Sequence, residues 1–359
     1  MRRTLAIILA AATAVSAGAQ GTGDLSVITG PQFTSYTIGS STTAKTVAQL
    51  SLPFAVIVPL TERFSLDVST NWAQSTVSSS GTASSRISGL TDTQLRINWS
   101  LGERTVLTLG ANVPRRMYKV PDKQQEAAGQ VASPFLLYPV SSMGSGLGTT
   151  AGLAQAMSFG EWNVGLGASV RVSSPFDAYQ VQTRVLRFEP GSEARVRVGV
   201  DRAFGDVRFT AGATYSMFTD DKADSTTFAT GGRALGQAAL AIPTSSGEWT
   251  LSAWDLYRGQ GQQSGGSAPW ENIVNGNLTY GFDWNGVFVQ PSLEGRAWMR
   301  DYEKAGMLGT ASVRFRFRFG LFDNLSVNPT VSYSLGNVYA STTPLDVQGF
   351  RALLLLRWR

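Results

Sequence analysis

The chain contains neither cysteine nor histidine. Without cysteine it cannot form a disulfide, and it cannot carry the lipid anchor that a lipoprotein attaches to a cysteine after its leader. Without histidine it lacks the usual base of hydrolases and the commonest metal ligand. We therefore expect no enzymatic activity, no catalytic residue, no metal site and no cofactor.

Long apolar runs are also missing. No stretch reaches the ~18 uncharged apolar residues from which a transmembrane helix is built, although apolar residues make up 43% of the chain. The net charge is +5, but the arginines are spaced along extended segments and are not clustered in a basic tail or helix. We therefore expect no nucleic-acid partner.

The first residues have the pattern of an export signal. A charged start, Met1-Arg2-Arg3, precedes a short apolar run from Leu5 to Val15 and small residues ending at Ala19. This order of a basic, an apolar and an Ala-x-Ala segment is typical of a cleavable signal peptide. We expect residues 1–19 to be the signal peptide and residues 20–359 to form one exported domain.

A strict two-residue alternation near the end of the chain indicates the fold. In 313–319 one valine and three phenylalanines occupy the odd positions and three arginines the even ones, so the two kinds of side chain lie on opposite faces of a strand. The same alternation recurs along nearly the whole chain, with too little other apolar material to cover every apolar face. The sequence therefore predicts an all-β, closed, antiparallel transmembrane β-barrel, with lipid outside, a polar lumen inside and no plug domain.

Turn residues divide this pattern into sixteen expected strands, or fourteen if the first hairpin or residues 232–258 are misread. The expected strands are 25–38, 46–60, 64–77, 90–101, 105–114, 147–159, 162–173, 193–201, 206–218, 232–242, 248–258, 272–284, 287–300, 309–320, 325–337 and 347–359. Short turns alternate with longer loops such as 78–89, 115–146, 174–192, 219–231 and 259–271. This alternation is typical of bacterial outer-membrane barrels, whose turns lie in the periplasm and whose loops lie outside the cell.

Placing the apolar face toward lipid predicts which charged side chains line the lumen. The expected pore-lining residues are Arg96, Arg171, Arg195, Arg197, Arg208, Glu294, Arg296, Arg300, Arg314, Arg316, Arg318, Arg351 and Arg357. The expected inward carboxylates are Asp67, Glu193, Asp201, Asp283 and Glu294, fewer than the arginines. The lumen is therefore expected to be positive and to favour small anions, unless the arginines mainly form ion pairs that brace the wall.

The longest loop, 115–146, is the candidate constriction. It contains the apolar segment Pro134, Phe135, Leu136, Leu137, Tyr138 and Pro139. Loops of this length are usually functional or disordered, and an apolar segment outside the cell would be unfavourable in water. We expect this segment either to fold into the barrel mouth or to form part of a surface loop.

Two further segments resemble known protein classes. The final residues carry Phe350, Leu354 and Trp358 on one face, which resembles the C-terminal signal that directs outer-membrane proteins to the barrel assembly machinery, although Arg359 follows the last aromatic residue. Residues Ser88 to Trp99, followed by Leu107 to Pro114, resemble the "meta-pathway" phenol-degradation transporters, which are similar to hydrocarbon transporters. The resemblance covers about 46–175 and implies uptake of hydrophobic or aromatic compounds. The N-terminal hatch of hydrocarbon transporters has no counterpart ahead of the first expected strand.

Three functions remain open at this point. The first is a passive outer-membrane channel for small solutes, through an arginine-rich lumen narrowed by the loop 115–146. The second is an uptake transporter for hydrophobic or aromatic compounds, for which 134–139 is the best feature. The third is a structural or adhesive surface barrel with a filled lumen. The expected partners are outer-membrane lipid and a small solute, and the sequence does not predict an oligomeric state.

Overall fold

The wall of the protein is one closed antiparallel β-sheet. A computed structural model describes residues 25–40, 44–114, 119–263, 266–319, 322–340 and 343–358. The first half of the wall comprises β1 (Ser26–Thr29) continued by β2 (Gln32–Ile38), β3 (Lys45–Pro59), β4 (Phe64–Ser79), β5 (Ser85–Leu90) continued by β6 (Thr93–Ser100), β7 (Thr105–Val113), β9 (Gly148–Phe159), β10 (Trp162–Ser173) and β13 (Glu193–Phe204). The second half comprises β14 (Val207–Phe218), β17 (Arg233–Pro243), β18 (Glu248–Arg258), β21 (Glu271–Trp284), β22 (Val287–Arg300), β23 (Glu303–Phe319), β24 (Phe322–Ala340) and β25 (Thr343–Trp358).

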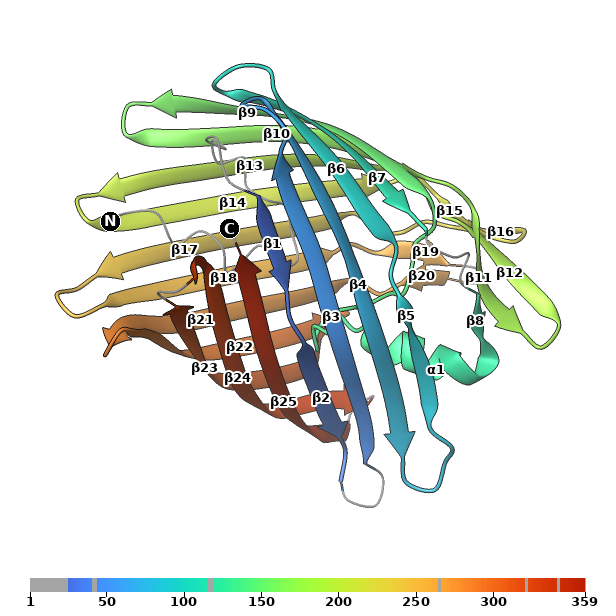
Figure 1. Ribbon diagram of the computed structural model, residues 1–359. Helices are drawn as coiled ribbons and strands as arrows, with labels where there is room; N and C mark the ends of the chain where they lie inside the picture. Colours follow the sequence, from blue (N-terminus) through green and yellow to red (C-terminus); the bar gives the residue numbers. More distant parts are fainter. Residues whose placement is uncertain are drawn as a thin grey trace.

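The ring closes where the last strand pairs with the first. β25 pairs antiparallel with both β1 and β2, and every other strand pairs with its neighbours in sequence (Figure 1). Counting β1 with β2 and β5 with β6, the barrel has sixteen strands. The predicted fold and strand number are confirmed, and the alternative of fourteen strands is wrong. The predicted signal peptide lies outside the described residues and remains a prediction.

The break between β1 and β2 has a local cause. Gly30 has φ +143°, and a Cβ at this position would lie 1.8 Å from the carbonyl oxygen of Leu354. Only glycine fits there, because the chain crosses the neighbouring strand so closely. Pro31 follows directly and cannot donate a ladder hydrogen bond. The kink divides one membrane-crossing strand into two segments.

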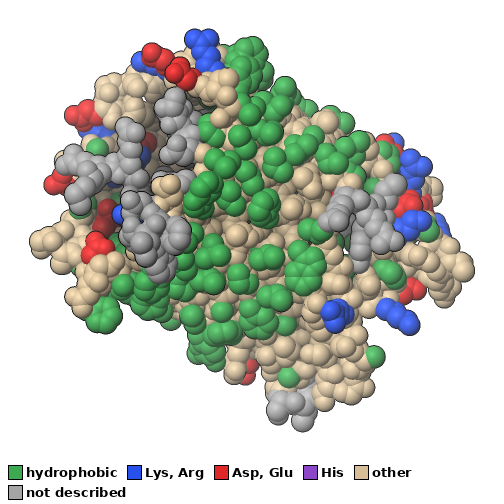
Figure 2. Space-filling model, viewed as in Figure 1, with side chains coloured by type: hydrophobic (Ala, Val, Ile, Leu, Met, Phe, Trp, Pro, Cys, Tyr) green, Lys and Arg blue, Asp and Glu red, His purple; other side chains and the backbone are tan. Residues whose placement is uncertain are grey.

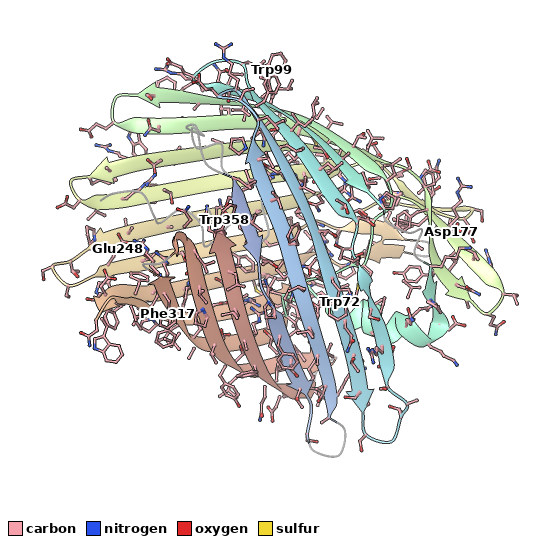
Figure 3. The ribbon with its side chains drawn as sticks, in the orientation of Figure 1. Trp72, Trp99, Asp177, Glu248, Phe317 and Trp358 are labelled. Carbon is pink, nitrogen blue, oxygen red and sulfur yellow. The ribbon has the colours of Figure 1, made fainter. Side chains whose placement is uncertain are left out.

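The outer wall carries an apolar band. Residues at alternate positions of neighbouring strands, such as Leu251, Leu278 and Leu293, are 42–64% exposed, and apolar side chains cover much of the visible wall in Figure 2. Trp99 extends from the wall at the upper edge of Figure 3. A closed barrel with an apolar outer band is the form in which strands cross the bacterial outer membrane, and the protein belongs to that membrane.

Aromatic pairs mark the two edges of this band. Trp249 and Tyr280 lie 4.6 Å apart near the short turns, and Trp270 and Tyr302 lie 4.8 Å apart near the longer loops. Such girdles form where amphipathic rings meet the lipid headgroups. The turns joining β9 to β10, β13 to β14 and β17 to β18 lie at the left of Figure 1, on the side assigned to the periplasm.

The longer loops contain elements that the sequence did not predict. β11 (Phe176–Val181), β12 (Arg184–Glu189), β15 (Asp221–Ala223) and β16 (Thr226–Phe228) form a second sheet with β8 (Val120–Pro121), and β19 (Gly261–Gln263) pairs with β20 (Gly266–Ala268). These elements lie together at the right of Figure 1. The single described helix, α1 (Asp122–Val131), has ten residues. No helix within the described ranges is long and apolar enough to cross a bilayer.

Two predicted strand boundaries were wrong for one physical reason. β23 begins at Glu303 rather than at 309, and β5 lies in a segment predicted to be a loop. These parts of the wall extend beyond the lipid, where the outer face meets water and the inner face packs against protein. On β4 and β5, Gln74 and Arg86 accordingly face outward and bond to each other, whereas Val77 is fully buried inside. The pattern that indicates a lipid-facing strand is reversed there.

Candidate functional site

The chain between β7 and β9 folds into the lumen. Its described part, residues 119–147, contains β8, α1 and an irregular segment, and we call it the lumen insertion. Its buried residues form a single cluster with inward-facing residues of the wall. From the insertion the cluster includes Ala127, Val131, Phe135, Leu136, Tyr138, Val140 and Met143, and from the wall Tyr36, Val47, Ala73, Val77, Ile87, Ile273, Leu308 and Val347. The wall residues belong to β2–β5, β21, β23 and β25, so the insertion covers one side of the lumen.

Hydrogen bonds hold the insertion to several strands of this wall. On β3, the amide of Gln49 donates to the carbonyl of Val140 (2.7 Å) and accepts from its N–H (2.8 Å). From strands that follow the insertion in sequence, Arg296 of β22 donates to the carbonyl of Phe135, and Arg351 of β25 donates to the carbonyl of Leu136 (2.7 Å). Buried carbonyl groups require such partners, so these side chains fix the path of the insertion.

The six residues of the predicted constriction segment have different environments. Phe135, Leu136 and Tyr138 are at most 6% exposed, and the Phe135 ring stacks on Trp298 at 5.5 Å. Leu137 is 37% exposed and has φ +52°, and Pro134 and Pro139 are only partly covered or exposed. The apolar segment therefore lies inside the barrel and packs mainly against its wall.

The opposite wall carries small side chains. On β7, β9, β10, β13 and β14 the inward positions include Gly110, Gly152, Gly165, Gly167, Gly199 and Gly212. A Cβ at Gly165 would meet no atom within 4 Å, and one at Gly199 would meet a single atom, at 3.8 Å. Space therefore lies in front of this wall, which we call the glycine wall. The candidate route for a solute runs between the glycine wall and the lumen insertion.

Arginines flank the glycine wall. Arg171 donates to the Ser145 hydroxyl of the insertion at 3.2 Å, and Arg195 pairs with Glu193 at 2.6 Å. Arg197 lies next to Arg195 on the inward face of β13. It is within electrostatic range of Arg96 on β6, from which β7, β9 and β10 separate it. Arg96 stands opposite Asp67 on the neighbouring strand. Cationic groups are therefore concentrated beside the open route.

Ten of the twelve predicted pore-lining arginines fall into two groups, and Arg351, which binds carbonyl groups of the insertion, and Arg357 stand apart from them. Arg195, Arg208, Arg296 and Arg300 pair with Glu193, Asp201, Glu294 and Glu271 respectively. Arg96, Arg171, Arg197, Arg314, Arg316 and Arg318 have no described carboxylate oxygen within 4.0 Å. The bracing role considered from the sequence applies to the first group. In the second group, Arg96, Arg197 and Arg316 lie within electrostatic range of Asp67, Glu193 and Asp283 but beyond ion-pair distance, so their charge is compensated less fully.

Sequence reasoning missed several inward-facing residues. Arg233 and Arg258 stand opposite each other on β17 and β18, in the segment whose alternation is weakest, and Arg258 pairs with Glu271 at 3.4 Å. Trp254 and Trp298 face inward and pack around the insertion, although aromatic residues were assigned to lipid. For Trp298 the signal was present in the alternation, because this residue lies two positions from Arg296 and from Arg300 on its own strand.

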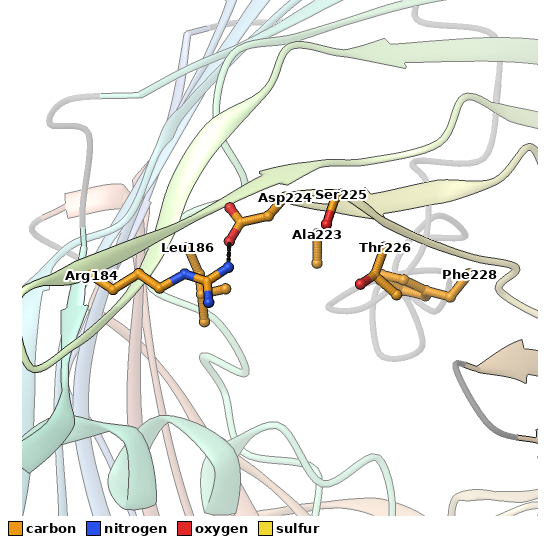
Figure 4. Close-up of a pocket in the computed structure, with 7 residues that line it drawn as sticks. All are labelled: Arg184, Leu186, Ala223, Asp224, Ser225, Thr226 and Phe228. Carbon is orange, nitrogen blue, oxygen red and sulfur yellow. Dashed lines mark hydrogen bonds and ion pairs between the residues drawn. The ribbon is translucent and has the colours of Figure 1, made fainter.

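A shallow cleft lies between the extracellular hairpins. It is lined by Arg184, Leu186, Ala223, Asp224, Ser225, Thr226 and Phe228 (Figure 4). Asp224 accepts from the backbone N–H of Arg187 (2.9 Å) and from the Arg184 guanidinium (2.7 Å). These hydrogen bonds lower the pKa of the Asp224 carboxyl from its usual value of 3.8. The contacts tie β12 to β15, so this side chain has a clear structural role.

The comparisons with known proteins return other barrels at low similarity. The chain is similar to a loop-deletion mutant of the outer membrane protein OmpT of Vibrio cholerae (7% identity, 93% of this chain and 99% of that one, TM-score 0.45). It is also similar to OccK7 (OpdD) of Pseudomonas aeruginosa (10% identity, 93% and 98%, TM-score 0.46). A third similar structure is an outer membrane channel of Pseudomonas putida F1 (14% identity, 96% and 99%, TM-score 0.39).

No family model matches the chain. No curated protein matches it either. Membership of the phenol-degradation transporter family is accordingly not shown.

Proposed function

We propose that the protein is a passive outer-membrane channel for small solutes, in which the lumen insertion narrows the route and the lining favours anions. The observation that carries the proposal is the asymmetry of the lumen. The insertion packs on β2–β5, β21, β23 and β25. The glycine wall opposite has glycine at many of its inward positions and therefore leaves space in the lumen. A narrowed but unfilled lumen is the arrangement of a channel that selects by size and charge.

The anion preference follows from the unpaired arginines. A guanidinium stays charged under all ordinary conditions, and low-dielectric walls concentrate the field of fixed charges inside a pore. Arg96 and Arg197 lie beside the glycine wall, and Arg314 lies further along the lumen on β23. A small anion is attracted at both levels, whereas a cation meets repulsion.

The test is the reversal potential of the purified protein in a planar bilayer under a potassium chloride gradient. We expect a potential of the sign that indicates greater permeability to chloride than to potassium. The double variant Arg96→Gln and Arg197→Gln should reduce this preference, because it removes two positive charges that form no ion pair within 4.0 Å among the described residues. A potential that indicates cation preference in the wild type contradicts the proposal.

Uptake of hydrophobic or aromatic compounds is a second candidate. Phe135, Leu136 and Tyr138, half of the apolar segment 134–139, are buried against the wall, so the segment offers only part of its apolar surface to a solute. A small cavity of about 120 Å³ remains where Leu137 and Pro139 face Leu353 of β25. Liposome swelling with sugars, small anions and aromatic compounds separates the two candidates. A protein that conducts nothing in either assay would instead support a structural or adhesive barrel.

A further inference from the structure

Three adjacent strands, β23, β24 and β25, place arginine and leucine side by side on the inner wall. Register pairs Arg314 with Thr330 and Thr330 with Leu353. One inward row further toward the periplasm, Arg316 bonds to Asn328, which stands opposite Leu355. The row beyond contains Arg318, Ser326 and Arg357. We call this surface, from Arg314 to Arg357, the mixed face.

The arginines of the mixed face have hydrogen-bonding capacity to spare. Arg314 donates to Thr330 Oγ1 and Gln290 Oε1, both at 3.4 Å, and Arg316 donates to Asn328 Oδ1 at 3.3 Å. These hydrogen bonds are long and involve neutral acceptors, and the Arg316 guanidinium also lies 4.9 Å from the centre of the Phe288 ring. A guanidinium has five N–H donors and binds carboxylates through two of them at once. The remaining donors of Arg314 and Arg316 therefore suit an anionic group that arrives with a solute.

The leucines of the mixed face belong to a wider apolar strip inside the lumen. Leu353 and Leu355 lie on the same face of β25 as Arg351 and Arg357, as the two-residue alternation requires. Two further apolar residues lie nearby on β1 and β3: Ile28 stands opposite Ala55 and, on its other side, opposite Arg357. All four apolar residues are only partly buried. Apolar surface is thus accessible on the inside of a charged pore.

The geometry sets the size of a solute that contacts both halves. Neighbouring strands are ~4.8 Å apart, so an arginine of β23 and a leucine of β25 stand on backbones about 10 Å apart, and successive inward rows are ~6.6 Å apart. The arginine side chain extends over part of this distance, so the gap that remains is about as wide as one ring with a carboxylate. An inorganic anion would contact only the arginines. An uncharged hydrocarbon would contact only the leucines and would have to displace water from the guanidinium groups.

We propose that the mixed face is a binding site for small carboxylates with an apolar body, such as an aromatic ring. The site rests on the proposed channel function and specifies its solute class. The carboxylate binds Arg314 or Arg316, and the ring lies on Leu353 and Leu355. The cavity lined by Arg351, Leu353, Leu137 and Pro139 extends outward from the first row of the mixed face, so the same combination of charge and apolar surface begins beneath the lumen insertion.

The experiment compares benzoate with acetate in planar bilayers at pH 7.5, where both are ionised. Bi-ionic reversal potentials give the permeability ratio of benzoate to acetate, and a potassium chloride gradient gives the ratio of chloride to potassium. We expect wild-type protein to favour benzoate beyond the ratio of the two free diffusion coefficients. The double variant Leu353→Ser and Leu355→Ser should reduce the benzoate-to-acetate ratio roughly fivefold, which corresponds to about 1 kcal/mol, and leave the chloride-to-potassium ratio unchanged.

The double variant Arg314→Gln and Arg316→Gln should reduce the permeability of both carboxylates relative to potassium. Arg86→Gln serves as the control, because this arginine faces outward and bonds to Gln74. Resistance to unfolding by detergent on gels shows that each barrel is intact. A leucine variant with an unchanged benzoate-to-acetate ratio overturns the binding site while the channel function stands. Cation preference in wild-type protein overturns the channel proposal itself.

Discussion

The inward-facing arginines differ in role according to the groups that they contact. Arg296 is 4% exposed and holds the insertion through a backbone carbonyl while pairing with Glu294. Arg208 pairs with Asp201 on the neighbouring strand, and Arg314 contacts only neutral groups. The two-residue alternation predicted the inward direction of each one. It could not predict which would be paired, because ion pairs depend on the register between strands and on where the insertion lies.

The glycine wall gives a prediction about pore size. Replacing Gly165 with Trp should lower single-channel conductance, because an indole side chain adds ~200 Å² of surface where a Cβ meets no atom within 4 Å. Barrel stability should change little. Gly295→Trp is the matched control, since Gly295 has equally open surroundings but faces lipid opposite Gly276 and Gly309. Equal conductance in the two variants would contradict the proposed route.

Phe135 gives a prediction about the insertion. Its ring is fully buried, stacks on Trp298 and lies against Gly306, so Phe135→Ala should destabilise the docked insertion by about 3–5 kcal/mol. We expect faster protease cleavage within 119–147 and noisier single-channel currents. Leu137→Ala, at a 37% exposed neighbouring position, should have much less effect. A cleavage rate equal to that of the wild type would show that Phe135 does not hold the insertion.

At the scale of the strands and loops, the extracellular extensions of the wall and the position of the insertion could not be predicted from the sequence. The membrane-crossing parts of the strands follow a simple alternation, and their number was predicted. Beyond the lipid, β4 and β5 reverse the faces, with Ile87 inward and Arg86 outward, so that their polar side no longer marks the lumen. The position of the insertion was also unpredictable, because an apolar segment such as 134–139 satisfies its burial equally well in the mouth or against any apolar wall.

Removal of the insertion tests its role as a constriction. We expect deletion of residues 122–143, bridged by a short glycine linker, to raise conductance and weaken the discrimination between small and large solutes. The wall should persist, because its hydrogen bonds run between strands. The deletion would expose Val77 and Ile87, which the insertion covers, so the extracellular extension of β4 and β5 should become less stable. Unchanged conductance and solute cut-off would rule out the constriction.

The extracellular sheet should depend on pH through Asp224. Its folded-state pKa is lowered by the Arg187 N–H and Arg184, so its stabilising contribution is present above the unfolded value of 3.8 and is lost as pH falls through the folded value. Amide hydrogen exchange of β12 and β15, corrected for intrinsic rates, should show less protection at pH 3 than at pH 7. Asp224→Asn should remove most of this difference. An unchanged difference would assign it to other carboxyls.

At the scale of the whole molecule, the closed sheet explains how so polar a chain resides in a membrane. Within the described residues, and with β1 and β5 counted together with β2 and β6, every strand of the barrel pairs with a strand on both sides, and the ring closes from β25 to β1 and β2. The described part of the barrel therefore presents no sheet edge to lipid, which is the condition for crossing a bilayer with strands. Closure could be predicted from the sequence because the apolar faces required lipid on every strand. The asymmetric filling of the lumen could not, because it depends on contacts such as Arg351 with Leu136, 215 residues apart.

The same long-range contacts have a kinetic consequence for assembly. The lumen insertion precedes β9, but its anchors Arg296, Leu308, Val347 and Arg351 belong to β22, β23 and β25. It therefore cannot complete its docking until the last strands are in place, although its contacts with β3 are available earlier, and contacts so distant in sequence form slowly. Refolding should produce a wide, poorly selective barrel first and the narrowed channel afterwards. The time between formation of the wide barrel and formation of the narrowed channel would measure how long the insertion takes to dock.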